Sequence, residues 1–552
     1  MRVFRAAGLY ALLTVVFTFP LALRLRIMDP GDSAYFTWAV GWGIHALKTD
    51  PLRLPHGNIY HPARYALFMD EPVLGTTLLV LPVALFTDDA VLLFNLARLL
   101  TYLVSALTAY LLARELGCGE APSLLAGAVF AFSPIRTDQL AHLSTLGSQW
   151  LPLALLFVFR FARSARPRDG VLAGLFYALS AYACGYHGLI GLVILPVACL
   201  PLVWKRPHLV SKAIPGLIVL GLSLLPLQLL HRAAFASENF ARPETHAAFH
   251  SAGIESFFAT SSSNWIWGEV TTPLRSLGSN NLFPGLVAPG LAIAGAFRLW
   301  RARRPPSREA LALALLIAGA VFVALGPEVR LMGETLFPSP YLWLRRVLPP
   351  LQGIRALSRA GIFMALALAC LLGLGARPWA NRPRLLALAW VAALAETLIV
   401  PVSMPAWARV IDSRRPMPPV YQWLKAQPVE VGVVELPMAR DDLTRPAFNE
   451  SIYMVRATWH WQRLVNGFAG VEPQQYQRLR ELTRRFPSPE SIELLRQTKV
   501  QYVLLNRGGF GPNQWARIER DLPGFEDCCL DRVAEFPGVT VFAIRPPPQS
   551  DP

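Results

Sequence analysis

One stretch decides the membrane topology expected for this chain: Val73-Leu-Gly-Thr-Thr-Leu-Leu-Val-Leu-Pro-Val-Ala-Leu-Phe86. It is largely apolar but only 14 residues long, whereas a membrane-crossing helix needs roughly 20 apolar residues. The stretch therefore suits a re-entrant or interfacial helix better than a span. Every apolar run that follows takes its orientation from this choice.

The composition is that of a membrane protein. Of 552 residues, 53% are hydrophobic and only 16% are charged, and the mean hydropathy is +0.38. Soluble domains are typically about 25% charged. The first apolar run, from Ala6 to Leu23, lacks a small-x-small cleavage site. We therefore expect an uncleaved first span rather than a secretory signal.

Eleven apolar runs are candidates for transmembrane spans. They cover residues 6–24, 90–113, 121–136, 146–163, 170–184, 187–204, 212–230, 282–300, 308–326, 357–375 and 384–402. The predicted fold is an all-α polytopic membrane domain of about 11 helices over residues 1–404.

The basic residues test whether Val73–Phe86 crosses the membrane. If it does not cross and the N-terminus is cytoplasmic, every tight basic cluster between spans is cytoplasmic, as the positive-inside rule requires. These clusters are Arg2/Arg5, Arg114, Arg160/Arg163/Arg166/Arg168, Lys205/Arg206/Lys212, Arg298/Arg301/Arg303/Arg304/Arg308 and Arg377/Arg382/Arg384. If it crossed, all later clusters would lie outside. We expect an inner-membrane protein whose net charge of +16 reflects topology and not a nucleic-acid partner.

This topology places the loop 25–89 and the C-terminal region outside the cytoplasm. In the loop, Tyr35, Trp38 and Trp42 recur at three- and four-residue spacing, which predicts an interfacial helix with an aromatic face.

The C-terminal region, residues 405–552, is expected to be a soluble α/β domain. The runs 431–436, 501–505 and 539–544 are typical of buried strands. Ser488-Pro489-Glu490 predicts the start of a helix, with an N-cap, a proline in the first turn and an early acid. The adjacent Cys528-Cys529 is assigned no chemistry, because neighbouring cysteines rarely bridge each other.

Four acids in the loop 25–89 lie close to apolar segments. Asp32 is either an N-cap of the following helix or a base or metal ligand near an acceptor hydroxyl or amine. Asp70 and Glu71 complement a helix dipole or hold a divalent cation. Asp29 and Asp70 are best explained structurally, which leaves Asp32 and then Glu71 as the catalytic candidates.

Further polar residues converge on the same membrane face. Arg136, Asp138 and His142 follow a proline at the end of a span, and Tyr186-His187 occupies a short turn. Taken singly, each is better explained structurally, by a simple ion pair or an interfacial histidine. Their shared side of the membrane is what makes them substrate-binding candidates.

Two arginines precede a span on the side where the positive-inside rule disfavours them. Arg355 and Arg359 lie four residues apart and so share a helical face. Guanidinium groups suit phosphate geometry, and the alternative is ordinary snorkelling at the end of a span. Asn95 and Arg98, inside the second span, are polar residues that could face an internal cavity.

With these residues in place, the chain resembles the GT-C superfamily, the polytopic glycosyltransferases that use polyprenyl-phosphate-linked sugars. Protein O-mannosyltransferases and aminoarabinose transferases belong to it, and the chain is most similar to a bacterial group without characterised members. The matching residues are Gly31-Asp32, Glu71, Phe132-Ser133-Pro134 with His142, Gly185-Tyr186, Arg355 and Arg359, Glu435-Leu-Pro437 and Asn466-Gly467-Phe468.

The resemblance implies that Asp32 deprotonates or orients the acceptor and that the outer arginines hold the lipid phosphate. One departure matters. Mannosyltransferases of this superfamily carry adjacent Asp-Glu soon after the first span, whereas here Asp32 stands alone and Asp70-Glu71 comes later.

The sequence thus predicts transfer of a sugar from a polyprenyl-phosphate donor to an extracytoplasmic acceptor, a lipid, glycan or protein. Asp32 and Glu71 are the expected catalytic residues. Arg355, Arg359, Arg136, His142, Tyr186 and His187 are the expected substrate-binding residues. No cofactor is required by this scheme, although a divalent cation is possible. The alternatives are a non-catalytic lipid or polysaccharide transporter, and a scaffold with an exported partner-binding domain.

Overall fold

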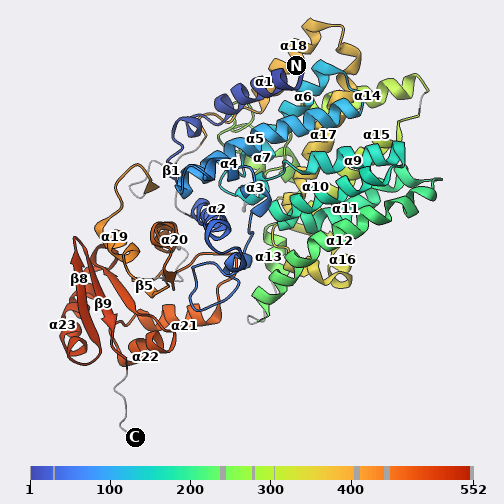
Figure 1. The fold of residues 1–552 in the computed structure, drawn as a ribbon. Coiled ribbons are helices and arrows are strands. Elements are labelled where there is room, and N and C mark those ends of the chain that lie inside the picture. Colours follow the sequence, from blue (N-terminus) through green and yellow to red (C-terminus); the bar gives the residue numbers. More distant parts are fainter. Residues whose placement is uncertain are drawn as a thin grey trace.

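A computed structural model describes residues 2–28, 31–236, 244–275, 280–303, 305–402, 411–428, 430–439 and 448–546. Asp29 lies outside these ranges. A bundle of helices forms one side of the molecule, and a helix-flanked β-sheet built from the C-terminal residues forms the other (Figure 1). The sheet lies beside the first loop, where Leu464 of the sheet bonds to Asn58 and His61.

Each of the eleven predicted spans contains a helix. The helices are α1 (Arg2–Phe17), α5 (Ala90–Glu115), α6 (Glu120–Ala131), α9 (Leu151–Ser164), α10 (Pro167–Ala183), α11 (Gly185–Val203), α12 (His208–Phe235), α14 (Val287–Arg301), α15 (Arg308–Leu325), α17 (Gly361–Ala376) and α18 (Pro383–Glu396).

Six helical segments in the described part of the chain are long and apolar enough to cross a membrane. They are Ala90–Glu115, Leu143–Ser164, Gly185–Val203, His208–Phe235, Arg308–Leu325 and Leu357–Trp379. The chain is therefore an integral membrane protein. The helices in the other five runs have 12 to 17 residues, so the count of eleven spans stays a prediction.

The stretch Val73–Phe86 does not form a single helix. It is divided into two short helices, α3 (Leu74–Thr77) and α4 (Leu81–Ala84). Gly75 in α3 packs directly on the backbone of α10 at Leu179 and Ala183, where a side chain would clash. The single re-entrant or interfacial helix that the sequence predicts is thus replaced by the two short helices α3 and α4. Neither is long enough to cross a bilayer.

The aromatic helix predicted for the membrane interface is instead buried in protein. It is α2 (Asp32–Thr49), in which Tyr35, Trp38 and Trp42 are all buried. The Trp38 indole N–H donates to Asn58 Oδ1 at 2.8 Å, and that of Trp42 donates to the Leu54 carbonyl at 2.9 Å. Indole rings at helical spacing suit a lipid interface and a protein core equally well. Here they lie in a protein core, which α2 shares with residues of the C-terminal unit.

The C-terminal unit, the described residues from 411 to 546, contains a five-stranded mixed sheet in the order β6–β5–β7–β9–β8. The strands are β5 (Gly432–Leu436), β6 (Arg463–Leu464), β7 (Tyr502–Asn506), β8 (Leu530–Phe536) and β9 (Val539–Ile544). β5 runs parallel to β6 and β7, and β9 is antiparallel to its two neighbours. All three predicted strands are present.

Helix α22 (Pro489–Gln497) begins where the sequence placed it. The Ser488 hydroxyl accepts the Ser491 N–H at 3.2 Å, and the Ser491 hydroxyl accepts the Ser488 N–H at 2.9 Å. This reciprocal capping satisfies two backbone donors at the helix start.

One face of the sheet packs on a hydrophobic cluster of the C-terminal unit itself, which includes Val433, Leu504 and Val541. The other face shares its core with the first loop. One hydrophobic cluster contains Trp38 of α2 together with Val434 and Leu464 of the sheet. The Leu464 N–H donates to the Asn58 carbonyl at 2.7 Å. Two short strands, β1 (Ile27–Met28) and β4 (Ile411–Asp412), also pair antiparallel. The C-terminal unit is therefore built onto the loop that carries Asp32.

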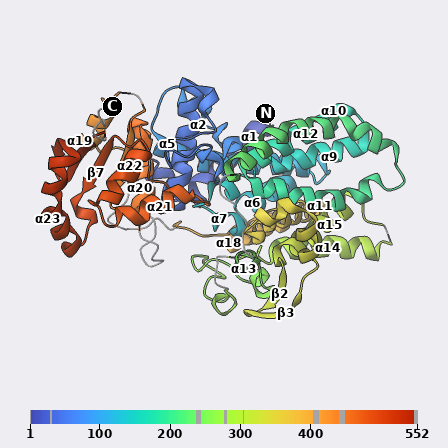
Figure 2. The same ribbon diagram turned by 90° about the horizontal axis from the view of Figure 1, so that it is seen from below.

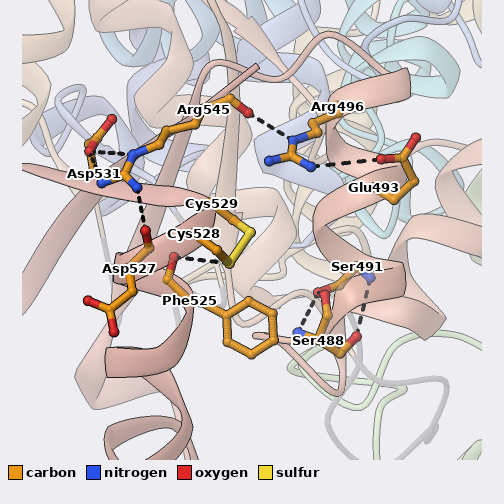
Figure 3. Close-up of a disulfide and its surroundings, with 10 residues drawn as sticks. All are labelled: Ser488, Ser491, Glu493, Arg496, Phe525, Asp527, Cys528, Cys529, Asp531 and Arg545. Carbon is orange, nitrogen blue, oxygen red and sulfur yellow. Dashed lines mark hydrogen bonds and ion pairs between the residues drawn. A yellow bond between two sulfur atoms is a disulfide. The ribbon is translucent and has the colours of Figure 1, made fainter. Parts of the chain in front are cut away.

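The vicinal cysteines form a disulfide, against the sequence-based expectation (Figure 3). Cys528 ends α23 (Pro512–Cys528) and Cys529 precedes β8. The Cys529 carbonyl accepts the Arg545 N–H at 2.9 Å, which fixes the turn against the end of β9. Adjacent cysteines can bridge only where the backbone between them bends sharply, and this helix-to-strand turn supplies the bend.

Candidate active site

A cavity of about 340 Å³ lies where five segments distant in sequence meet. They are the start of α2, the segment around α7 (Pro134–Thr137), His250, the residues 280–282, and the segment around the turn η7 (Leu357–Ala360) that leads into α17. The lining residues are Asp32, Ile135, Asp138, Gln139, Ala141, His142, Thr145, His250, Asn280, Asn281, Leu282, Arg355, Ala356, Ser358, Arg359 and Ile362.

Asp32 and His142 form a hydrogen bond at the wall of this cavity. Asp32 Oδ2 lies 3.1 Å from His142 Nε2, and the Asp32 side chain is 50% exposed. The hydrogen bond from His142 lowers the pKa of the Asp32 carboxyl. Partial burial opposes this change, and the charges of Arg355 and Arg359 lower the pKa further. Asp32 is thus an ionised carboxylate that remains accessible to a ligand.

The N-cap role considered for Asp32 does not hold. Asp32 is the first residue of α2, and Gly31 is its N-cap. Gly31 has a φ of +92°, which favours glycine. Its N–H donates to the Ser451 hydroxyl at 3.1 Å, so the C-terminal unit holds the peptide that precedes the acid.

The polar residues inside α5 support the same loop. Asn95 Nδ2 donates to the carbonyls of Leu25 and Ile27 at 2.8 and 2.9 Å. Arg98 Nη2 donates to the Ser33 hydroxyl at 2.6 Å. Asn95 and Arg98 do not line the cavity described above. They hold the residues on both sides of Asp32 in place.

Arg355 and Arg359 both line the cavity. The Arg359 guanidinium carbon lies 4.2 Å from the centroid of the Tyr186 ring, in a cation–π contact. Among the described residues, neither arginine makes an ion pair within 4.0 Å, and the buried Arg355 Nε has no hydrogen-bond partner. Two guanidinium groups thus face a cavity without a carboxylate of their own.

Asp138 is the second carboxylate at the cavity, and it does not pair with Arg136 as considered from sequence. Its Oδ2 accepts the side-chain N–H of Asn281 at 3.1 Å. Burial raises the pKa of Asp138, although the hydrogen bonds from Asn281 and Ser261 oppose this. Asn281 was not identified from sequence, because an uncharged residue in a long loop gives no local signal.

Arg136 does not line the cavity. It is fully buried, and its guanidinium group donates to the Ser148 and Ser105 hydroxyls and to the Ala131 and Leu146 carbonyls at 2.6–3.0 Å. These bonds occupy most of its donors inside the protein. Arg136 joins α5, α6 and the segment 146–148, and it is not part of the cavity lining.

Glu71 is also absent from the cavity lining. Its carboxylate Oε2 accepts the Gly185 N–H at 2.6 Å, at the first residue of α11. Anions at a helix N-terminus are stabilised by the helix dipole. Tyr186, the next residue, carries the ring beneath Arg359. Glu71 therefore has the geometry of a residue that positions Arg359, and the structure does not bring it to Asp32.

His187 lies deeper in the same helix. Its ring is fully buried, edge-on to the Phe363 ring at a centroid distance of 6.1 Å. Both ring nitrogens have no hydrogen-bond partner among the described residues. Of the predicted site residues, the structure thus brings Asp32, His142, Arg355 and Arg359 together, adds Tyr186 beneath Arg359, and excludes Arg136, Glu71 and His187 from the lining.

Residues 12–397 match a protein family described as a domain of unknown function (DUF6311). The chain belongs to this family. No curated protein matches it.

Solved structures place the chain in the GT-C fold. The arabinofuranosyltransferase AftD from Mycobacteria has a TM-score of 0.57 and 15% sequence identity, over 99% of this chain and 40% of that one. The chain thus spans about two fifths of that enzyme's length. ArnT from Cupriavidus metallidurans, bound to undecaprenyl phosphate, has a TM-score of 0.51 and 13% identity, over 97% of both chains. The Archaeoglobus fulgidus oligosaccharyltransferase tethered to an acceptor peptide has a TM-score of 0.50 and 13% identity, over 99% of this chain and 75% of that one.

A divalent cation at Asp70 and Glu71 does not fit the donors that the structure supplies. Asp70 Oδ2 accepts the Gly470 N–H at 2.6 Å, and its Oδ1 accepts the Glu71 N–H at 2.8 Å. Within the described ranges, no three His, Cys, Asp or Glu side chains are grouped as cation ligands. We derive no step through a metal ion.

Replacing Glu71 by glutamine is expected to flatten the pH dependence of stability. Burial raises the pKa of Glu71 from 4.5 to about 7, so folding stability falls by up to about 3 kcal/mol as the pH rises between these values. Glutamine keeps the acceptor for the Gly185 N–H and has no proton to lose. Thermal unfolding in detergent between about pH 5 and pH 8 measures the difference, and identical slopes for both proteins would contradict it.

Replacing Arg136 by glutamine is expected to destabilise the protein by about 3 kcal/mol, because carbonyls and hydroxyls that it satisfies lose their buried partner. Binding of an anionic ligand in the cavity should stay unchanged in the folded fraction, because Arg136 does not line the cavity. Thermal unfolding and ligand titration measure the two effects. Weakened binding with normal stability would restore Arg136 as a ligand-binding residue.

Proposed function

We propose that this protein is a membrane glycosyltransferase, which moves a sugar from a polyprenyl-phosphate donor to an acceptor outside the cytoplasm. One observation carries the proposal: a single cavity holds an ionised carboxylate paired with a histidine, Asp32 and His142, and two arginines without ion-pair partners among the described residues, Arg355 and Arg359. The GT-C fold supports it.

The reaction needs two kinds of group. An acceptor oxygen or nitrogen forms a bond to the anomeric carbon of the sugar, while the bond between that carbon and the phosphate oxygen breaks. Asp32 orients the acceptor and takes its proton as the bond forms. His142 holds the carboxylate in place through the hydrogen bond to its Oδ2.

The leaving group is the polyprenyl phosphate, which departs with the electron pair of the broken bond. Arg355 and Arg359 stabilise its added charge, because guanidinium groups form charge-assisted hydrogen bonds to phosphate oxygens. Tyr186 presents Arg359 to the cavity by stacking beneath it. Undecaprenyl phosphate is the lipid bound in the ArnT structure, and we propose a carrier of this class for the present protein.

The cavity favours an enzyme over a scaffold, which would need no such site. In the topology that accompanies this proposal, the N-terminus is cytoplasmic and the C-terminal unit is extracytoplasmic. The cavity and the C-terminal unit then share one side, because Ser451 and β4 contact the segment on which Asp32 stands. The sugar and the acceptor, whether lipid, glycan or protein, are left open.

Lipid binding tests the proposal. The purified protein in detergent is titrated with undecaprenyl phosphate or with the uncharged alcohol undecaprenol, and thermal unfolding is followed. Binding to the native state stabilises it, so only the phosphate should raise the unfolding temperature. The double variant Arg355→Gln, Arg359→Gln should lose this stabilisation, whereas Arg64→Gln, at an exposed arginine of the first loop, should retain it. Equal effects of both lipids, or none, would contradict the proposal.

A further inference from the structure

A two-stranded hairpin and a short helix occupy the connection between two apolar helices. The hairpin consists of β2 (Glu328–Leu331) and β3 (Glu334–Pro338), and it is followed by α16 (Tyr341–Val347). The connection joins the end of α15 at Leu325 to the candidate span that begins at Leu357. Figure 2 shows the hairpin at the flank of the helical bundle beside α13 (Glu244–Phe249) and α14, away from the C-terminal sheet.

The outer surface of this connection is rich in apolar side chains. Five of them are more than half exposed: Met332 (58%), Leu336 (51%), Phe337 (54%), Trp343 (76%) and Val347 (73%). Leu331 and Leu348 are exposed beside them. We call the hairpin and α16, with these side chains, the flank surface. Monomeric soluble proteins rarely expose a contiguous apolar patch of this kind unless it binds something.

Three polar groups of the flank surface bond to the rest of the protein. The Arg330 guanidinium donates to the Ala248 and Ser251 carbonyls. The Met332 N–H donates to Glu255 Oε2 at 3.0 Å. Arg345 is 4% exposed and lies 3.7 Å from Glu244. These charged groups are thus satisfied inside, and the exposed charges Glu334 and Arg346 lie among a larger number of outward-facing apolar side chains.

We propose that the flank surface contacts the lipid bilayer, with its apolar side chains at the boundary between headgroups and acyl chains. Both ends of the connection join helices that are long and apolar enough to cross a membrane, so it lies within a few residues of the bilayer. An exposed tryptophan such as Trp343 is typical of that boundary. The neighbouring Arg346, also exposed, can reach lipid phosphates while its stem lies on apolar surface.

Continuity with the lipid-facing helices favours the bilayer over a protein partner. The apolar helix α12 is only 11% buried within the molecule, so the bilayer covers it. On α15, which leads directly into the hairpin, 33% of the apolar window is buried. The flank surface extends this lipid-facing exterior beyond the end of α15. The inference is independent of the proposed transferase activity, since it concerns only what covers this face.

Spin-label accessibility tests the inference on the full-length protein in lipid vesicles. Cys199, Cys528 and Cys529 are first replaced by serine to limit background labelling. Met332→Cys and Trp343→Cys are then labelled separately, and Val533→Cys on β8, an exposed position of the C-terminal unit, is the matched control. Collision with oxygen, which concentrates in lipid, is compared with collision with a water-soluble nickel chelate.

We expect the ratio of oxygen to nickel collisions to be several-fold higher at positions 332 and 343 than at position 533. A ratio equal to that at 533 would overturn the inference, because the flank surface would then face water. Low collision with both reagents at 332 and 343 would also overturn it, since a second copy or another protein would then cover the surface. If Met332→Cys fails to fold, Phe337→Cys on the opposite strand takes its place.

Discussion

Replacing Asp32 by asparagine is expected to lower the rate of sugar transfer at least about 100-fold, the usual contribution of a positioned general base. Asparagine fills the same volume and keeps an oxygen near His142 Nε2, but it cannot take the acceptor's proton. The loss should lie in kcat, while the donor KM changes little, because the arginines and not Asp32 hold the phosphate. The assay is the initial rate of transfer from a polyprenyl-phosphate sugar in proteoliposomes.

A matched control separates this effect from a general loss of charge. Asp88→Asn removes a carboxylate whose side chain is 82% exposed and pairs with Lys48 at the surface, so it should leave kcat unchanged. Transfer at the wild-type rate by Asp32→Asn would rule out Asp32 as the base and the proposed mechanism with it.

The pH profile gives a second check on Asp32. Its pKa lies below the usual value chiefly because of the hydrogen bond to His142, so the carboxylate stays ionised and the rate should fall only at strongly acidic pH. His142→Ala removes that hydrogen bond and the pKa of Asp32 rises. The acid limb of the rate profile should therefore move to higher pH, whereas a purely structural role of His142 would lower the rate without moving the limb.

The fold was largely predictable because the bilayer permits few solutions. A long apolar run must satisfy its own backbone in lipid, so each predicted span between 6 and 402 contains a helix. The strand runs of the C-terminal unit were equally clear. The short stretch Val73–Phe86 was harder, because its break depends on Gly75 lying against α10, which no local pattern reports.

The site was predictable only in part. Topology alone brought Asp32, His142, Arg355 and Arg359 to one face, and the structure places them around one cavity. The contact of Glu71 with the start of α11 could not be predicted, because its partner, Gly185, lies 114 positions away, and capping by a distant residue leaves no trace in local spacing. The roles of long-range partners depend on tertiary contacts that composition and periodicity do not encode.

Arg136 shows the same limit. An arginine at the end of an apolar run gives the same sequence pattern in two cases. It can bind a ligand phosphate, or it can bind four groups of its own protein, as Arg136 does. Only the number of donors already used distinguishes the two cases. Arg359 stacks on the Tyr186 ring and makes no ion pair with any described residue. By this criterion it is a better candidate for binding phosphate than Arg136.

Replacing Arg359 by glutamine is accordingly expected to lower kcat about 100-fold, comparable with the loss of one donor from an oxyanion site. Glutamine removes the charge that stabilises the departing phosphate and the cation–π contact with Tyr186. Arg359→Lys should recover only part of the rate, because an ammonium group cannot hold two phosphate oxygens in a planar fork. Tyr186→Phe, which keeps the ring beneath the guanidinium, is the matched control and should remain close to wild type.

Product inhibition distinguishes a phosphate-binding arginine from one that merely supports the fold. Polyprenyl phosphate is the product that carries the charge, so its inhibition constant should rise for Arg359→Gln and stay unchanged for Asp32→Asn. Both variants lose turnover, but they act at opposite ends of the bond that breaks. If Arg359→Gln lost turnover and still bound polyprenyl phosphate as tightly as wild type, Arg359 would act on the acceptor side, and Arg355 alone would be left to hold the leaving group.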